Sequence, residues 1–195
     1  GRITAMEARP LGVHVTFSPV MDINNNPKNP IINFRAYSDN REIVSKFGSA
    51  FIQGAQDNGL VTCAKHFPGH GNTAADSHTS LPTIEGSQTE LDSLELYPFR
   101  KAVEAGVKMI MVGHIALPGL DKSGDPASHS VAITTDLLRK EMGFDGIIIT
   151  DGMEMGGLTQ MAWAGESAVR AVEAGVDILL LPIDVKQTIN SLVEA

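Results

Sequence analysis

Short apolar runs alternate along this chain with longer segments in which apolar residues recur at helical spacing. The runs expected to form strands are 13–19, 60–64, 108–112, 146–150 and 177–181. All but the first are nearly uninterrupted apolar stretches, a pattern typical of parallel strands buried on both faces. The segments that follow a helical period are 41–58, 89–105, 135–142 and 166–174. This alternation predicts βα units and an α/β fold.

Capping residues support these boundaries. Asp39 or Asn40 is expected to cap the first helix, and Thr135 the third, because such side chains accept hydrogen bonds from free N–H groups. Two helices end in the same Glu-Ala-Gly-Val sequence, which places Gly106 and Gly175 directly after them. Glycine suits the left-handed residue that often follows a helix.

Five strands and four helices fit two architectures. An open doubly wound sheet is complete at 195 residues, whereas a (β/α)₈ barrel needs about 250 residues. Both architectures place ligands in loops at the carboxyl ends of the strands. The pattern alone leaves the choice open, but it directs attention to the residues that follow each strand.

Composition bounds the function. Hydrophobic residues make up 43% of the chain, which is enough for one core and predicts a single domain over residues 1–195. With 15 Lys and Arg against 23 Asp and Glu, the net charge is −8, so nucleic acid and anionic lipid are poor partners. No apolar run approaches the ~20 residues of a membrane span. The single cysteine, Cys63, excludes an internal disulfide.

Asp151 follows the run 146–150 directly. If that run is a strand, the carboxylate stands at its carboxyl end, where barrel enzymes place catalytic groups. A charge there is costly unless it is paired or functional. The alternative is a structural cap for the next helix, because Asp is a favoured capping residue.

Further candidates follow the second and third runs. Lys65 and His66 end the second, and His114 follows the third; Lys65 either binds polar substrate groups or forms an ion pair. Asp76 and His78 lie two residues apart on a loop rich in small residues, so the carboxylate can orient the imidazole for proton transfer. The alternative for this pair is a solvated turn.

A metal-dependent hydrolase is a competing hypothesis. His66, His70, Asp76 and His78 are potential ligands. However, the Pro68-Gly69 pair between the first two histidines prevents the helix that would bring them together as a metal-binding pair. We therefore predict neither a metal nor an organic cofactor.

Several of these residues belong to longer motifs. The run Lys65-His66-Phe67-Pro68-Gly69-His70-Gly71, followed by Asp76-Ser77-His78 and Leu81-Pro82, resembles the signature of the bacterial β-N-acetylglucosaminidase branch of glycoside hydrolase family three. Similar stretches are Phe17 to Asp22 with Asn26-Pro27 and Arg35, Leu138-Arg139 with Gly143 to Gly146, Thr150-Asp151 with Met155, and Ala174 to Asp177. The resemblance covers nearly the whole chain in the same order.

The resemblance implies a retaining hydrolase of terminal β-N-acetylhexosamine residues on a (β/α)₈ TIM-barrel-like domain. Asp151 matches the nucleophile, and His78 with Asp76 matches the acid/base pair. Carried over in the same way, the residues expected to bind the sugar are Asp22, Arg35, Lys65, His66 and, with a weaker match, His114. The partner is then a carbohydrate containing N-acetylglucosamine, from cell-wall recycling or from chitin.

The sequence also departs from the branch. The branch carries an Asp and a Glu-Gly-Gly segment on an earlier strand, and this chain, which begins at Gly1, has neither. By the resemblance it covers about strands three to seven of the barrel, so we expect an incomplete domain that is inactive or weakly active unless it pairs with itself or with the missing barrel segments. The missing segments or an additional domain are possible partners. A glycoside phosphorylase and an inactive sugar-binding fragment stay open, as do cytoplasmic and exported locations.

Overall fold

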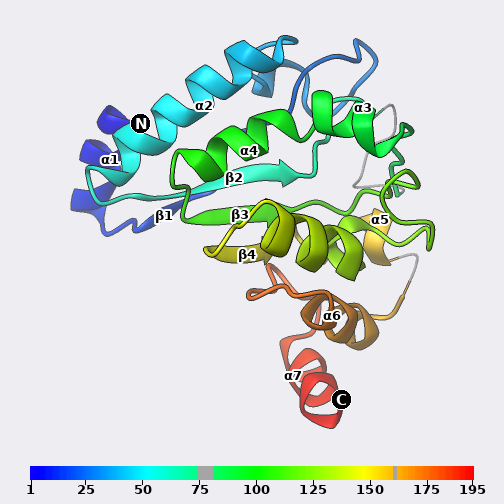
Figure 1. Cartoon of the computed structure of the whole chain (residues 1–195). Helices are drawn as coiled ribbons and strands as arrows, with labels where there is room; N and C mark the ends of the chain where they lie inside the picture. The colour runs from blue at the N-terminus through cyan, green and yellow to red at the C-terminus, as the bar shows by residue number, and fades with distance from the viewer. Residues whose placement is uncertain (74–80, 160–161) are drawn as a thin grey trace.

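A parallel sheet forms the centre of the molecule. The computed structural model describes residues 1–73, 81–159 and 162–195. Its four strands lie in the order β1-β2-β3-β4 and are all parallel. They are β1 (Val15–Thr16), β2 (Val61–Phe67), β3 (Met109–Val112) and β4 (Ile147–Thr150). Their carboxyl ends therefore lie at one edge of the sheet, on the right in Figure 1.

Helical segments connect the strands. They are α1 (Arg2–Ala8), η1 (Arg9–Leu11), η2 (Asn33–Arg35), α2 (Arg41–Gln56), α3 (Gln88–Ser93), α4 (Tyr97–Glu104), η3 (Ala127–His129), the π-helix η4 (Ala132–Glu141), α5 (Gly156–Thr159), α6 (Ala164–Glu173) and α7 (Val185–Glu194). Helix α2 leads into β2, α4 into β3 and η4 into β4, while α7 lies at the end of the molecule away from β1 (Figure 1). No helix in the described part of the chain has the length and apolar character to cross a bilayer.

The two faces of the sheet are packed differently. On one face, Ile110 and Ile148 belong to a large core that includes Phe99 of α4 and Leu138 of η4. On the other face, the buried residues Cys63, Met109, Met111 and Ile149 form a separate cluster of strand residues. A doubly wound sheet has helices on both faces, so within the described residues this packing favours the barrel architecture.

The strand register positions the polar residues. Cys63 pairs with Met109, and Met109 with Ile147, so these side chains face the same way at one level of the sheet. Every second side chain along a strand shares that face, so Lys65, two residues after Cys63, and Asp151, four residues after Ile147, both lie at its carboxyl edge. Their charges interact there.

The fifth predicted strand, 177–181, is wrong as a strand. It forms only an isolated parallel bridge, between Ile178 and Ile149. The Leu180 N–H is hydrogen-bonded to the Thr150 hydroxyl instead of a backbone carbonyl, and Leu181 has a positive φ of 50°, which ends the extended conformation. Ile178 is 41% exposed, so burial on both faces was also wrong for this segment.

Two other predicted elements differ from the structure by more than three residues. The first strand is limited to Val15–Thr16, although a strand was predicted over 13–19. Pro19 has no N–H to contribute to the ladder, and only its carbonyl takes part, accepting from the Lys65 N–H. The helix predicted over 89–105 is divided into α3 and α4, with Pro98 in the first turn of α4, where a missing N–H costs nothing.

Capping is as predicted at three of four positions. The Asn40 side chain accepts from two N–H groups at the start of α2, and Gly106 and Gly175 have positive φ angles of 75° and 103°. Thr135 is not a cap, because η4 begins at Ala132. Its hydroxyl instead donates to the Ala174 carbonyl at the end of α6.

Candidate functional site

Asp151 is held at the carboxyl end of β4. The Asp151 N–H donates to the Val112 carbonyl of β3 at 2.9 Å. The N–H of the next residue, Gly152, donates to Oδ1 of the Asp151 carboxylate at 2.8 Å. The side chain is half-buried. The first bond extends the sheet by one residue, and the second fixes the direction of the carboxylate.

Neighbouring groups keep Asp151 ionised. Burial is the largest single influence and raises the pKa of the carboxyl. The His66 ring and the Gly152 N–H oppose it most strongly, and further help comes from His114 and Lys65. The net pKa lies below the ordinary value, so the group is a carboxylate at neutral pH.

His66 interacts with Asp151 and also with two residues of the segment that follows β1. The His66 Nδ1 lies 2.7 Å from Asp22 Oδ2, and its Nε2 lies 3.4 Å from Arg35 Nη2. A guanidinium only donates hydrogen bonds, so Nε2 accepts from Arg35 and Nδ1 donates to Asp22. The backbone bond between Lys65 and His66 is cis.

Asp22 is enclosed by the loop that follows β2. Its oxygens accept from the His66 N–H at 3.2 Å and from the His70 N–H at 2.7 Å, and its side chain has no exposed surface. Burial is the largest influence and raises the pKa of Asp22, but His66, through its ring and its backbone N–H, and His70 hold that pKa below its usual value. The Asp22 carboxylate therefore contacts His66 and has no exposed surface of its own, although the resemblance implied that it contacts sugar hydroxyls directly.

Two cations lie near each other at this end of the sheet, and one of them, Lys65, interacts with the carboxylate of Asp151. Lys65 is half-buried, and burial, followed by the nearby Arg35, lowers the pKa of its ammonium group, while Asp151 raises it. Arg35, on η2, is exposed and also donates to the Ile31 carbonyl at 3.2 Å. The pair supplies hydrogen-bond donors suited to hydroxyl and carbonyl oxygens of a polar substrate.

His114 supports the peptide next to Asp151. Its Nε2 lies 3.1 Å from the Gly152 carbonyl, and its Nδ1 lies 2.8 Å from the Ser128 hydroxyl. Because a carbonyl only accepts, the ring is protonated at Nε2 and accepts from Ser128 at Nδ1. Burial, the largest influence, lowers the pKa of this imidazole, so it is neutral and both of its nitrogens are used within the protein.

Asn29 is a structural link that sequence reasoning missed. Its amide nitrogen donates to the carbonyls of His70 and Gly71 at 2.7 and 3.0 Å, and its oxygen accepts from Ile31 N–H and Ile32 N–H. It thereby joins the loop after β1 to the loop after β2. The only signal in the sequence was an amide residue among other polar loop residues, which does not reveal a partner 41 residues away.

The acid/base pair predicted at Asp76 and His78 lies outside the described residues. Two of the four ligands in the metal hypothesis are therefore also outside them. Within the described residues, no group of three or more His, Cys, Asp or Glu side chains is arranged to hold a metal ion. The structure thus brings together Asp151, Lys65, His66, Arg35, Asp22 and His114.

A cavity adjoins the carboxylate. It has a volume of about 390 Å³ and is lined by Asp151, Gly152, Glu154, Met155, Gly156, Leu180 and Leu181. It therefore lies between the loop after β4 and the segment that forms the isolated bridge. A volume of this size accommodates a small organic ligand, since ligand sites begin at about 300 Å³.

The whole chain, residues 1–195, matches the family described as Glycosyl hydrolase family 3 N terminal domain. It is 38% identical over 191 residues to Beta-hexosaminidase A of Pseudoalteromonas piscicida, covering 92% of this chain and 32% of that protein. The chain spans about a third to a half of the length of the curated relatives it matches.

Solved structures are also similar. A glycoside hydrolase family 3 beta-N-acetylglucosaminidase from Paenibacillus sp. str. FPU-7 superposes with a TM-score of 0.97 at 41% identity, covering 100% of this chain and 38% of that one. A beta-glucoside phosphorylase, BglX, superposes with a TM-score of 0.95 at 28% identity, covering 99% of this chain and 36% of that one.

Proposed function

This chain belongs to the Glycosyl hydrolase family 3 N terminal domain family, and from that premise we propose that the protein removes terminal non-reducing β-N-acetylglucosamine residues. The predicted family and the predicted (β/α)₈-barrel-like fold class are confirmed by the family match and by the Paenibacillus structure. The names of the relatives, Beta-hexosaminidase and beta-N-acetylglucosaminidase, support the substrate. The single-domain assignment over 1–195 stays a prediction.

The observation that carries the proposal is the ionised Asp151 beside cationic and hydrogen-bonding groups at the carboxyl edge of the sheet. In the first step, a carboxylate oxygen bonds to the anomeric carbon while the bond to the leaving oxygen breaks. His78, oriented by Asp76, gives that oxygen its proton. In the second step, His78 takes a proton from water, the water oxygen bonds to the anomeric carbon, and Asp151 is released.

The described residues have distinct parts in this proposal. Lys65 and Arg35 donate hydrogen bonds to the hydroxyls of the sugar, and His66 accepts one at its Nε2. Asp22 positions His66 through the 2.7 Å contact with its ring. His114 also stands among the residues expected to bind the sugar, and its contact with the Gly152 carbonyl supports a positioning part, since the Gly152 N–H holds the nucleophile.

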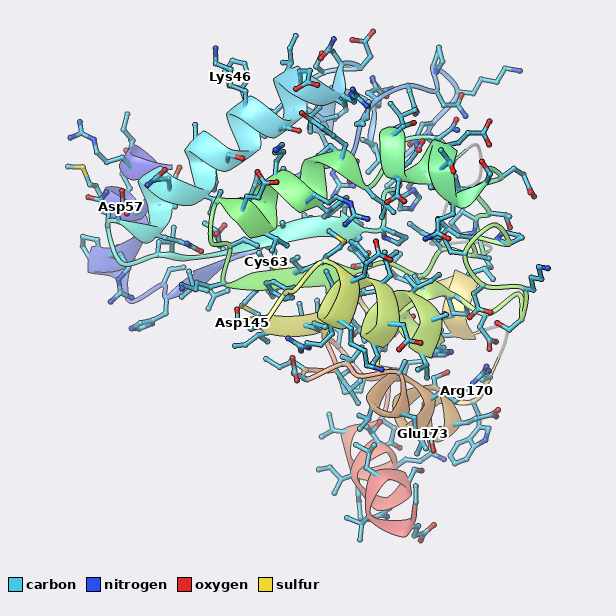
Figure 2. The ribbon with its side chains drawn as sticks, in the orientation of Figure 1. Lys46, Asp57, Cys63, Asp145, Arg170 and Glu173 are labelled. Carbon is cyan, nitrogen blue, oxygen red and sulfur yellow. The ribbon has the colours of Figure 1, made fainter. Side chains whose placement is uncertain are left out.

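A test compares a chromogenic N-acetyl-β-glucosaminide with the corresponding β-glucoside, using the full-length gene product. We expect faster release from the N-acetyl sugar, and a loss of about 10⁴-fold or more in Asp151→Asn, as for removal of other catalytic residues. Asp145→Asn is a matched control because Asp145 is exposed and precedes the same strand at its opposite end (Figure 2). Equal activity of Asp151→Asn and wild type would refute the proposal.

A phosphorylase is the second candidate because the BglX enzyme is so similar in fold. In that reaction, phosphate replaces water in the second step, and an imidazole base repels the incoming anion less than a carboxylate would. Hydrolysis predicts that added phosphate leaves the rate of sugar release unchanged. Faster release, with a sugar phosphate as product, would instead establish the phosphorylase.

A further inference from the structure

The segment that follows β3 turns back on itself close to the nucleophile. The Ala127 N–H donates to the Ile115 carbonyl at 2.8 Å, and an antiparallel bridge lies next to this bond. Residues beside a paired position in an antiparallel ladder also face one another, so the backbone brings Ser128 opposite His114. The Ser128 hydroxyl lies 2.8 Å from Nδ1 of the His114 ring, and both residues are buried.

This contact determines how the His114 ring donates. The Gly152 carbonyl, 3.1 Å from Nε2, only accepts, so Nε2 carries the proton. In a neutral ring Nδ1 then has no proton and accepts from the Ser128 hydroxyl. Contacts at both nitrogens hold the ring against rotation. The other tautomer would set the Nε2 lone pair against the carbonyl oxygen of Gly152.

Gly152 connects the His114 ring to the nucleophile. The peptide unit after Gly152 is held at both of its polar groups, because its carbonyl accepts from His114 and its N–H, of Met153, donates to the Leu180 carbonyl at 2.9 Å. The N–H of Gly152 itself donates to Asp151 Oδ1 at 2.8 Å. Glycine has wide backbone freedom, so these contacts, and not the residue itself, keep Oδ1 in place and set the direction in which Oδ2 points.

We propose that Ser128 is a positioning residue for the nucleophile and that it acts through the His114 ring. The inference rests on the proposed function, since it takes Asp151 as the nucleophile. Removal of the hydroxyl leaves a buried ring nitrogen without its donor, which loosens the ring and then the Gly152 peptide. Small displacements of a reacting group lower kcat because the chemical step needs close alignment, whereas the groups proposed to hold the sugar are on other segments.

The test is a double-mutant cycle with the full-length gene product and a chromogenic N-acetyl-β-glucosaminide. Ser128→Ala is expected to lower kcat about 10-fold and to change KM by no more than about twofold. His114→Phe is expected to lower kcat about 100-fold, and the double variant also by about 100-fold, because without the ring the hydroxyl has nothing to orient. A merely structural part for Ser128 predicts that the two losses multiply, to about 1,000-fold.

Ser45→Ala is the control. Ser45, on α2, is also buried, and its hydroxyl donates to the Arg41 carbonyl at 2.7 Å. The variant therefore loses a buried serine hydroxyl and its hydrogen bond without affecting His114, and it is expected to keep the wild-type kcat and KM.

The wild type tests the same claim without any variant of Ser128. In protein labelled with ¹⁵N in its histidine rings, the signals of His114 are identified by their loss in His114→Phe. Their chemical shifts report which ring nitrogen carries the proton, and we expect it on Nε2, with Nδ1 accepting a hydrogen bond.

The outcomes separate the two proposals. A proton on Nδ1, a wild-type kcat in Ser128→Ala, or losses that multiply in the double variant would overturn the positioning inference and leave the proposed function standing. If the wild type releases nothing from the chromogenic substrate, the proposed function itself fails.

Discussion

Replacing His129 by leucine is expected to make the folded protein more resistant to acid. His129, on η3, is 6% exposed, and neither ring nitrogen makes a hydrogen bond of ordinary geometry within the described residues. The groups that face it are Arg170 of α6 (Figure 2), His114, Asp125 and the main chain of Ser167. Arg170 is itself paired with Asp125 at 2.5 Å.

The size of the effect follows from the imidazole's pKa. Burial, and then the neighbouring Arg170 and His114, lower the pKa of His129 from 6.5 to about 4. Between those values the unfolded chain binds a proton that the folded chain does not, so the free energy of unfolding falls as the pH falls. One pH unit corresponds to about 1.4 kcal/mol, so the loss reaches roughly 3 kcal/mol near pH 4. Leucine has no such proton.

The assay is urea denaturation of the full-length gene product at about pH 7 and about pH 4.5. From pH 7 to 4.5, the free energy of unfolding is expected to fall by roughly 2 kcal/mol less in His129→Leu than in the wild type. His14→Leu serves as a control because His14 is exposed. If His129→Leu and the wild type lose the same free energy, the buried histidine does not control acid sensitivity.

Three further predictions concern the site and its supports. His114→Phe loses the contact with the peptide after Asp151, so kcat is expected to fall about 100-fold with a smaller change in KM. His114→Gln keeps an N–H donor and is expected to recover part of the lost kcat. An unchanged kcat in His114→Phe would show that His114 does not position the nucleophile. Burial raises the pKa of the Cys63 thiol to about 12; the Asp151 carboxylate adds to this increase and Lys65 opposes it. Iodoacetamide at pH 8 is therefore expected to label Cys63 only after unfolding. Fast labelling of the native protein would contradict the burial of this thiol. In Gly71→Ala the new Cβ would lie 1.6 Å from the Ile23 carbonyl oxygen. Thermal denaturation is therefore expected to show that the free energy of unfolding falls by about 3 kcal/mol or more. A wild-type melting temperature would show that the two loops are not in close contact.

The central strands were predictable because their pattern is local. The runs that became β2, β3 and β4 are apolar and bounded by breaks, as buried parallel strands are. The first and last runs were less informative, because Pro19 limits the ladder locally, whereas the end of the last run depends on Thr150, a residue on another strand. Predicting that side-chain bond requires knowing which segments become neighbours.

The site was predictable where it depends on strand ends. Asp151, Lys65 and His66 stand where the barrel rule places functional groups, and the structure brings these side chains close enough to interact. The supports were not predictable, since Asn29 and Ser128 act across 41 and 14 residues of sequence and carry no periodic pattern. The spacing of Asp76 and His78 raised them as a proton-transfer pair against a solvated turn, and the resemblance favoured the pair, which lies outside the described residues.

The most direct test of the central claim is to trap the covalent intermediate. The full-length gene product is incubated with a fluorinated N-acetylglucosaminyl fluoride, which forms the glycosyl-enzyme quickly and hydrolyses slowly, and its peptides are analysed by mass spectrometry. We predict one added fluorosugar on the peptide that contains Asp151 and none in Asp151→Asn. A label on another carboxylate, or turnover of the reagent by Asp151→Asn at the wild-type rate, would contradict the assignment of Asp151 as the nucleophile.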